Sequence, residues 1–375
     1  MTDVYLVSDN IISPLGQTTA ENWAQLERGH SGIRLHTDPA RSSDPFHASL
    51  FEKDEILKPD GLTRFESLLV ASIREALSHT EISLTDPRTI LILSSTKGNI
   101  GLLETQPRSP ALTDRLSLAT SAKLIARQFG AANPPLLVSN ACISGVLALL
   151  SAQRMLASGQ YAHAVVAGAD LITRFILSGF QALQAISPDP CRPFDATRRG
   201  ITLGEAAGTA VLSTDKKFTS PIRIAGGATS NDANHISGPS RTGDGLATAI
   251  GSALRAARLP AEVIDFVSAH GTATLHNDEM EAAALTRAGV QAAPVNSLKG
   301  YFGHTLGAAG LIETLVSAQS LHENSLLPTA GFSELGVSNP LNVTSMLHLA
   351  PLRHCLKTAS GFGGCNAALV LSKEE

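Results

Sequence analysis

The sequence lacks the features by which membrane, secreted and nucleic-acid-binding proteins are usually recognised. None of its apolar runs approaches the roughly 20 residues that a helix needs to span a bilayer. Its 29 basic and 33 acidic residues give a formal net charge of -4, which excludes a global basic field for nucleic acid or anionic membrane. A signal peptide would have lysine or arginine near its start, where this chain has Asp3. We therefore expect a soluble protein whose partner contacts are local.

Cysteine is also scarce. The chain has four cysteines in 375 residues, at widely separated positions: Cys142, Cys191, Cys355 and Cys365. In a chain of this size such spacing argues against a disulfide framework and against a metal site of the Cys-x-x-Cys type. We expect reduced thiols in a cytoplasmic protein and no bound metal.

What the chain does have is material for a large core, because 43% of its residues are hydrophobic. Short β-rich runs alternate with helical patterns over 144–160 and 307–324, which predicts layered α/β packing. The expected strands are the N-terminal run, 89–95, 136–140, 163–169, 209–213, 265–271, 293–300 and 367–372. Residues 30–60 lack periodicity and are expected to form a loop or cap, and 187–200, with three prolines, reads as a long ordered loop.

Weak internal sequence repeats suggest that one α/β unit is duplicated. A strand followed by a polar or glycine-rich turn occurs at "ILSSTKGN" and "VSAHGTAT", and again at "LLVSNACISG" and "LKTASGFGGC". The two members of each pair are therefore predicted to occupy equivalent places in two halves of the fold.

The stretch "VSNACISGVLALL" (138–150) places Cys142 between an expected strand and an expected helix. At a helix N-terminus the dipole favours thiolate over thiol, and the small neighbours Ala141, Ser144 and Gly145 would admit a substrate. This is the logic of a nucleophile elbow. The alternative is an ordinary buried cysteine, since free cysteine is among the most buried residue types.

Two histidines and a lysine follow other expected strands. His270 ends a strand in "VSAHGTAT", and Lys299 and His304 follow the next strand in "VNSLKGYFGHTLGAAG". Each residue alone is more often structural, but the combination favours a catalytic cleft. In "SGFGGCNAALVL" (360–371), glycines around Phe362 would let a backbone amide approach a bound carbonyl and form an oxyanion hole with that of Cys142. A plain β-hairpin explains those glycines equally well, and Cys365 is assigned to packing.

Six motifs in order resemble the β-ketoacyl-acyl-carrier-protein synthases, which are condensing enzymes of the thiolase superfamily. They are "ACISG" around Cys142, "RPFDATRRGITLGEAAG" (192–208), "NDANHISGPSRTGDGL" (231–246), "SAHGTAT" (268–274), "LKGYFGHTLGAAG" (298–310) and "GFGG" (361–364). The resemblance implies an α/β thiolase-like fold with two duplicated halves in a layered αβαβα arrangement. Residues 1–215 would carry the nucleophilic cysteine, and residues 216–375 the two histidines.

By this resemblance the reaction is a decarboxylating Claisen condensation. Cys142 would accept an acyl chain from the phosphopantetheine arm of an acyl carrier protein, and no other cofactor is implied. Neutral His270 and His304 would donate hydrogen bonds to the malonyl thioester oxygen as carbon dioxide leaves. The amides of Cys142 and Phe362 would hold the second oxyanion.

The resemblance also implies roles for supporting residues. Lys299 would order the active-site network with Glu313, and as a cation it would depress the pKa of a neighbouring histidine. Thr272 and Thr274 match the hydroxyl pair that holds the pantetheine arm. Phe362 matches the gate between malonyl and acyl sites; packing is the alternative role for it and for the threonine pair. Phe180 matches a pocket-wall aromatic as well as it matches simple packing.

Some features depart from the family pattern. The chain is short for an elongating synthase, and Lys97 lies where the family usually lines its acyl pocket with an apolar residue. A charge pointing inward there would disfavour a long saturated chain, so specialised polyene or polyketide assembly is an alternative to fatty-acid synthesis. Otherwise Lys97 would extend to solvent or pair locally.

The expected partners are an acyl carrier protein and a second copy of the chain, or a second ketosynthase-like chain in a heterodimer. Candidate docking residues for the carrier are Arg64, Arg74, Arg198 and Arg199. An alternative function is that of a non-catalytic partner that sets chain length, which Cys142 and both histidines weigh against. A cysteine hydrolase would leave Lys299 and the second histidine idle. A biosynthetic thiolase would need Cys365 in a different place.

Overall fold

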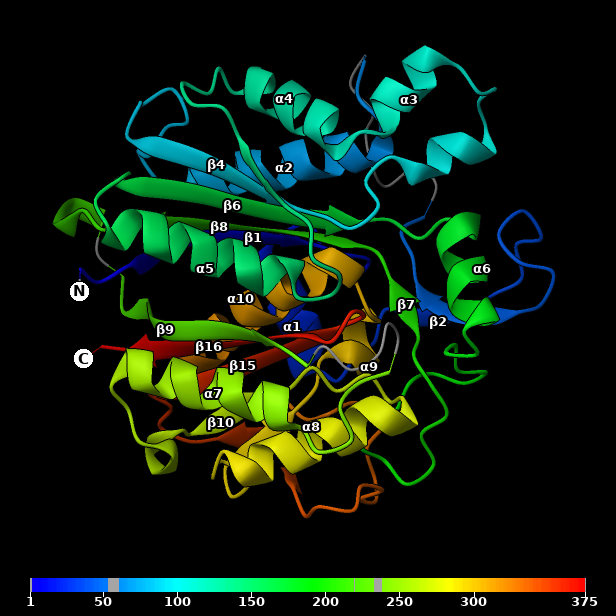
Figure 1. Cartoon of the computed structure of the whole chain (residues 1–375), viewed down its shortest axis with the longest axis vertical. Coiled ribbons are helices and arrows are strands. Elements are labelled where there is room, and N and C mark those ends of the chain that lie inside the picture. Colours follow the sequence, from blue (N-terminus) through cyan, green and yellow to red (C-terminus); the bar gives the residue numbers. More distant parts are fainter. Residues whose placement is uncertain (1, 53–60, 219, 233–237, 375) are drawn as a thin grey trace.

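Two sheets and three layers of helices stack in the order αβαβα (Figure 1). The computed structural model describes residues 2–52, 61–218, 220–232 and 238–374. Within these residues the two sheets are joined through β1 and β9 into one eleven-stranded sheet, in the order β13-β11-β10-β15-β16-β9-β1-β8-β6-β4-β5. The α/β layered arrangement predicted from the alternating pattern is confirmed.

The first half of the sheet is built by the N-terminal part of the chain. Its strands are β1 (Tyr5–Ile12), β4 (Thr89–Ser94), β5 (Leu136–Val138), β6 (His163–Asp170) and β8 (Ala206–Ser213). The second half consists of β9 (Ile222–Asn231), β10 (Phe266–Ser268), β11 (Pro294–Asn296), β15 (His354–Gly361) and β16 (Cys365–Lys373), with β13 (Asn342–Val343) outside β11. The bounds of β4, β5, β6, β8, β10, β11 and β16 match the expected strands within four residues, whereas β9 and β13 were not predicted. Many of the strands are buried along their whole length, as strands covered on both faces must be.

The two halves repeat one strand order. Reading outward from the join, the first half runs β1-β8-β6-β4-β5 and the second runs β9-β16-β15-β10-β11. In both, the fourth strand is parallel to its two neighbours, and the join is a single Tyr5–Arg223 pair. The duplication is therefore confirmed, and β4 and β10 are equivalent strands, as the first pair of repeats predicted. The second pair of repeats was wrong as a pair of equivalent strands, because β5 corresponds to β11 and not to β15. The boundary between 215 and 216 stays a prediction.

Helices form the outer and central layers. Figure 1 shows α2 (Arg64–Ser78) and α4 (Leu118–Gln128) over the first half and α7 (Asp244–Ala257) and α8 (Leu275–Arg287) over the second. Between the sheets lie α5 (Ser144–Ala157) and α10 (Ala309–Glu323). Three apolar clusters fill the spaces between layers, and the central one joins α5 and α10 to both sheets. The remaining helices are α1 (Thr19–Glu27), α3 (Pro110–Leu116), α6 (Arg174–Ala182) and α9 (Lys299–Phe302), with 3-10 turns η1 (Ile100–Glu104), η2 (Lys216–Phe218), η3 (Ala261–Val263) and η4 (Leu306–Ala308).

The segment 30–60 is more regular than its sequence suggested. It forms β2 (Ile33–His36) and β3 (Phe46–Ser49), which join β7 (Leu203–Gly204) in a three-stranded sheet, while 53–60 lies outside the described residues. Of the two expectations, a loop or a cap, the described part is not a plain loop, because pairing with a distant strand supplies order that local periodicity does not reveal. A further small sheet pairs β12 (Ser325–Leu326) with β14 (His348–Leu349). In the described part of the chain, no helix is both long and apolar enough to cross a membrane.

Candidate active site

A pocket of about 450 Å³ opens where the two halves of the fold meet. Residues from both halves line it, and they include most of the residues predicted from the sequence. The predicted members are Cys142, Phe180, Arg199, His270, Thr272, Thr274, His304 and Phe362. The sequence analysis therefore identified one site and not several.

Cys142 lies at the turn between β5 and α5, as predicted. Ala141 adopts a left-handed backbone with φ of 43°, which turns the chain sharply before the helix begins at Ser144. The Ser144 hydroxyl closes this turn, because its oxygen accepts the N–H of Asn140 at 2.8 Å and its proton goes to the carbonyl of Ala141 at 2.6 Å. Close packing of α5 against α10 requires Gly145, where a β-carbon would lie 2.5 Å from the Leu311 nitrogen. Of the described cysteines, Cys142 alone is not fully buried.

His270 follows β10 and is held by carboxylates from α8. Glu281 accepts the N–H groups of His270 and Gly271 at 2.8 and 2.7 Å. One turn earlier on the same helix, Asp278 accepts the N–H of Thr272 at 3.0 Å. The spacing of three residues puts both acids on one face of α8, so the helix fixes the whole turn.

His304 lies in the short link between α9 and η4. Its N–H donates to the carbonyl of Thr202 at 2.7 Å, and its own carbonyl accepts the N–H of Gly204 at 3.0 Å. Gly303 before it has φ of 67°, and a β-carbon there would lie 2.4 Å from the carbonyl oxygen of Leu203. The glycine is therefore required for His304 to reach the pocket.

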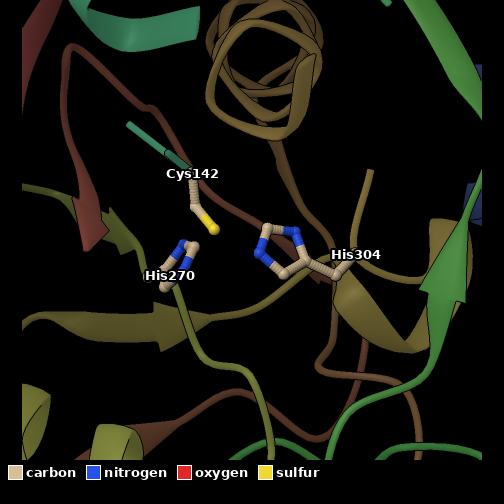
Figure 2. Close-up of side chains that lie close together, drawn as sticks. All are labelled: Cys142, His270 and His304. Atoms are coloured by element: carbon tan, nitrogen blue, oxygen red, sulfur yellow. The ribbon is translucent and has the colours of Figure 1, made fainter. Parts of the chain in front are cut away.

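The thiol and the two imidazoles converge on one point. Figure 2 shows the Cys142 sulfur beside both rings, and one ligand atom from each of the three residues lies within 4.8 Å of the others. The two rings meet edge to face, with centroids 5.2 Å apart and planes at 84°. The three residues come from turns more than 30 residues apart in the sequence. The fold brings these turns together and so assembles the predicted Cys-His-His set.

Backbone and lysine donors fix the tautomer of both rings. The N–H of Leu306 points at Nδ1 of His304 at 3.2 Å, and the ammonium of Lys299 lies 3.5 Å from Nδ1 of His270. Because each Nδ1 faces a donor, a neutral ring must carry its proton on Nε2. Both rings then offer an Nε2–H group. This arrangement also disfavours a metal, because a metal would need the lone pair of the nitrogen that holds the proton.

Burial and positive charge keep both imidazoles neutral. The pKa of His270 and that of His304 are well below the usual value, chiefly because burial penalises the charged ring and secondly because Lys299 is nearby. Burial also raises the pKa of the Cys142 thiol to about 12, against the opposing pull of Lys299. Cys142 keeps some solvent exposure, but the protein atoms around its sulfur exclude most of the water that would stabilise a thiolate. The expected stabilised thiolate was therefore wrong for the resting chain, which holds a thiol.

Behind the imidazoles lies a buried ion cluster. The Lys299 ammonium pairs with Oε1 of Glu313 and donates to the carbonyl of His270 at 2.8 Å. The structure thus places Lys299 and Glu313 together, as the resemblance implied. Lys357 of β15 also reaches Glu313, at Oε2, 2.7 Å away. Sequence reasoning missed this second lysine, although a lysine inside a strand that is otherwise buried is an available signal.

Two hydroxyls and two aromatic rings line the approach to the thiol. The hydroxyls of Thr272 and Thr274 bond each other at 2.8 Å. The glycine-rich segment is a hairpin turn between β15 and β16, with Gly361 opposite Cys365, so that reading of its glycines is confirmed. The turn also brings Phe362 to the pocket, where its half-exposed ring stacks on Phe180 with centroids 5.9 Å apart. The roles of these residues stay predictions.

Other predicted residues lie elsewhere. Arg198 is only 6% exposed and lies between Asp278 and Glu279, so it holds the fold and was wrong as a docking residue. Lys97 is exposed, and its backbone N–H donates to Asp170 at 3.1 Å. Arg64 pairs with Glu205, while Arg74 and Arg199 are exposed. Residues 233–237 of the fourth motif lie outside the described residues.

The α8 carboxylates were also missed. Asp278 and Glu281 follow the His270 turn in "LHNDEMEAAAL", and their spacing of three residues on a predicted helix was the available signal. Burial raises the pKa of Asp278 to about 6. No local pattern shows which turn such a pair will contact.

Comparison with known proteins gives one consistent family. Residues 1–217 match the beta-ketoacyl synthase N-terminal domain, and residues 222–333 match the C-terminal domain of the same family. The granaticin polyketide putative beta-ketoacyl synthase 1 of Streptomyces violaceoruber is 30% identical, over 99% of this chain and 98% of its own. The 3-oxoacyl-[acyl-carrier-protein] synthase 2 of Vibrio cholerae is 28% identical, over 99% of each chain. Among solved structures, the ishigamide ketosynthase/chain length factor superposes with a TM-score of 0.92 at 28% identity, covering all of both chains.

Proposed function

The chain belongs to the β-ketoacyl synthase family, and on that premise we propose that it is a catalytic, carrier-protein-dependent condensing enzyme. The observation that carries the proposal is the mutual approach, within 4.8 Å, of a thiol and two imidazoles that are held neutral. A chain that acts only by shape would not need all three groups in one pocket.

The first step is transfer of an acyl chain to Cys142. The sulfur attacks the carbonyl carbon of an acyl thioester on the phosphopantetheine arm, the old carbon–sulfur bond breaks, and the proton of Cys142 ends on the departing pantetheine thiol. The hydroxyls of Thr272 and Thr274 are proposed to hold the arm. The amides of Cys142 and Phe362 are proposed to bind the transient oxyanion.

The second step is decarboxylation of a malonyl thioester. The bond to the carboxylate breaks, carbon dioxide leaves, and the electron pair becomes an enolate whose oxygen accepts the Nε2–H groups of His270 and His304. Donors that already point at the oxygen need no reorganisation as the charge develops. The carbanion then attacks the acyl carbon on Cys142, so a carbon–carbon bond forms and the bond between the acyl carbon and sulfur breaks. The sulfur leaves as a thiolate, which takes a proton from solvent to restore the resting thiol. No metal or cofactor of the protein's own is needed in this proposal.

The proposed carrier is an acyl carrier protein, which docks beside the pocket mouth. Arg199 lies on that mouth, and its exposed side chain pairs with Asp189 at 3.4 Å. A cationic residue there suits the acidic surface that we propose for the carrier. A second copy of this chain, or a second ketosynthase-like chain, is the proposed partner in a dimer. The acyl substrate class is proposed to include polyene or polyketide chains as well as fatty acids.

One alternative has specific support. The solved structure that resembles this chain at a TM-score of 0.92 is the ishigamide ketosynthase/chain length factor, so a chain-length role is the second candidate function. Under that alternative, Cys142, His270 and His304 would be dispensable.

The test supplies acyl and malonyl carrier proteins to the purified chain, alone and with any copurifying partner, and measures carbon dioxide and the 3-oxoacyl product. We expect both products from the wild type, and no condensation from Cys142→Ala. Cys365→Ala, which changes a buried cysteine at the start of β16, should retain activity. Wild-type activity that survives Cys142→Ala in a heterodimer would support the chain-length role instead.

A further inference from the structure

Two buried lysines share one carboxylate behind the imidazoles. Lys299 of α9 and Lys357 of β15 are both 0% exposed, and Glu313 of α10 lies between their ammonium groups. Lys299 alone would neutralise Glu313. Burying a second ammonium costs several kcal/mol before compensation, so the presence of Lys357 calls for an explanation beyond charge pairing.

The bonds of Lys357 show where it acts. Its ammonium donates to the carbonyls of Ser268 and Ala269, at 3.0 and 3.2 Å, and meets Oε2 of Glu313 as an ion pair without a well-angled hydrogen bond. Lys299 donates to the next carbonyl, that of His270. Three consecutive carbonyls at the end of β10 therefore all accept from ammonium groups, and the third belongs to a catalytic histidine.

Among the described residues, charged and titratable groups approach His270 from every element packed against it. Lys299 and Glu313 face it from α9 and α10, and Lys357 from β15. Glu281 of α8 binds its backbone, and His304 and Cys142 share the pocket. Both lysines lower the pKa of both imidazoles, and Lys357 has its own pKa lowered by burial. Removing Lys357 would leave Glu313 paired with Lys299 alone and would reduce the positive potential at the rings.

We propose that Lys357 is a second positioning residue of the decarboxylation step, which ties the end of β10 to Glu313 and holds His270 as a neutral donor. This inference rests on the proposed function for its effect on catalysis. The other part of the inference, that Lys357 holds the carbonyls at the end of β10 and the His270 ring, does not depend on the proposed function. Lys357 touches neither substrate nor reacting atoms, so it acts through His270.

The test compares Lys357→Met, which removes charge and donors, with Lys357→Gln, which keeps an N–H donor without charge. The matched control is Cys355→Ala, because Cys355 is a buried, uncharged residue two positions earlier on the same face of β15. Each variant is assayed for malonyl decarboxylation across pH, and the His270 ring is titrated by NMR in protein labelled with 13C-histidine.

We expect the midpoint of the His270 titration to rise by about one pH unit in Lys357→Met and Lys357→Gln, and not in Cys355→Ala. The acid limb of decarboxylation should rise with it. Decarboxylation at pH 7 should fall about tenfold in Lys357→Met and less in Lys357→Gln. Unchanged titration midpoints in both lysine variants would overturn the proposal, even if activity falls.

The outcomes separate the inference from the proposed function. If the wild type releases no carbon dioxide, the proposed function fails, while the NMR titration still decides the role of Lys357. If these two lysine variants do not fold, Lys357→Arg, which keeps the positive charge, is titrated instead and should leave the His270 midpoint unchanged, whereas a rise of about one pH unit in Lys357→Arg would refute the electrostatic role. A wild-type His270 that titrates near 6.5 would refute the proposed electrostatic role.

Discussion

The ends of β4 and β10 occupy equivalent places in the two halves of the fold, yet the proposed chemistry uses only the end of β10. After β4, the buried carboxylate of Asp170 accepts the N–H groups of Thr96 and Lys97 at 3.1 Å and that of Gly307 at 2.7 Å. After β10, the α8 carboxylates accept the N–H groups of the His270 turn in the same manner. A buried acid that gathers backbone donors is thus common to both strand ends.

The difference lies in the cations. Lys97, after β4, extends to the surface, whereas the turn after β10 is backed by the buried ammonium groups of Lys299 and Lys357. Carboxylates alone fix a turn and draw its donors inward. The buried positive charge of the two lysines behind the turn after β10 makes the neutral form of the His270 imidazole the favoured one. We propose from this comparison that the acids fix both turns, whereas the two lysines prepare only the turn after β10 for the proposed chemistry.

The largest effect should come from removing a donor at the reactive strand end. We expect His304→Ala to reduce malonyl decarboxylation by about 10²- to 10³-fold, because one of two enolate donors is lost. Acyl transfer to Cys142 should remain within a few-fold of wild type. The measurements are carbon dioxide release and mass spectrometry of the acylated protein.

His276 offers a matched control for that variant. It also lines the pocket but is exposed, so His276→Ala should leave decarboxylation within a few-fold. Loss of acylation with decarboxylation preserved in His304→Ala would contradict the assigned roles.

The next effect separates fold from chemistry at the two carboxylates. Asp170→Asn and Glu281→Gln should each lower the free energy of unfolding by about 2 kcal/mol, because each leaves buried N–H groups without a full acceptor. Only Glu281→Gln should also slow decarboxylation per folded molecule. Denaturant unfolding and active-site titration check this. Equal losses of decarboxylation in both variants would mean that the two strand ends contribute alike to catalysis.

The sequence predicted well which residues meet in the pocket, because their signals are local. A strand, a sharp turn and a small-residue helix start marked Cys142, and a histidine before glycine at a strand end marked His270. The resemblance to a family then supplied the roles of Lys299 and Glu313. Burial along whole strands was also visible, since β6 and β8 read as continuous apolar runs.

The sequence could not predict the tertiary contacts between distant segments. Lys357 and Glu313 lie 44 positions apart, and nothing local to either predicts that β15 and α10 bring them together. Burial also opposes one expectation, because desolvation raises the pKa of the Cys142 thiol although the residue lies beside a helix N-terminus. Arg198 and Arg199 are adjacent in the sequence, yet one is buried among acids and the other reaches the pocket mouth.

The two chemical steps should differ in pH dependence. With the Cys142 pKa raised to about 12, the thiolate fraction grows about tenfold per pH unit between pH 7 and 9, and acyl transfer should rise with it. The imidazoles have lowered pKa values, so they are already neutral over that range, and decarboxylation should stay flat down to about pH 6. Single-turnover acylation and carbon dioxide release measure the two. An acid limb of decarboxylation centred near 6.5 would place the rings in an ordinary environment.

The smallest effect tests positive charge outside the buried cluster. Arg199→Glu should raise the KM for carrier-bound substrates several-fold, and the effect should shrink in high salt, because an exposed charge steers docking without touching the chemistry. Its kcat and its pH profile should not change. Arg199→Gln serves as the milder control and should give an intermediate KM. A fall in kcat with unchanged KM would mean that the mouth arginine acts on the reacting groups, and the division between surface charge for binding and buried charge for catalysis would then not hold.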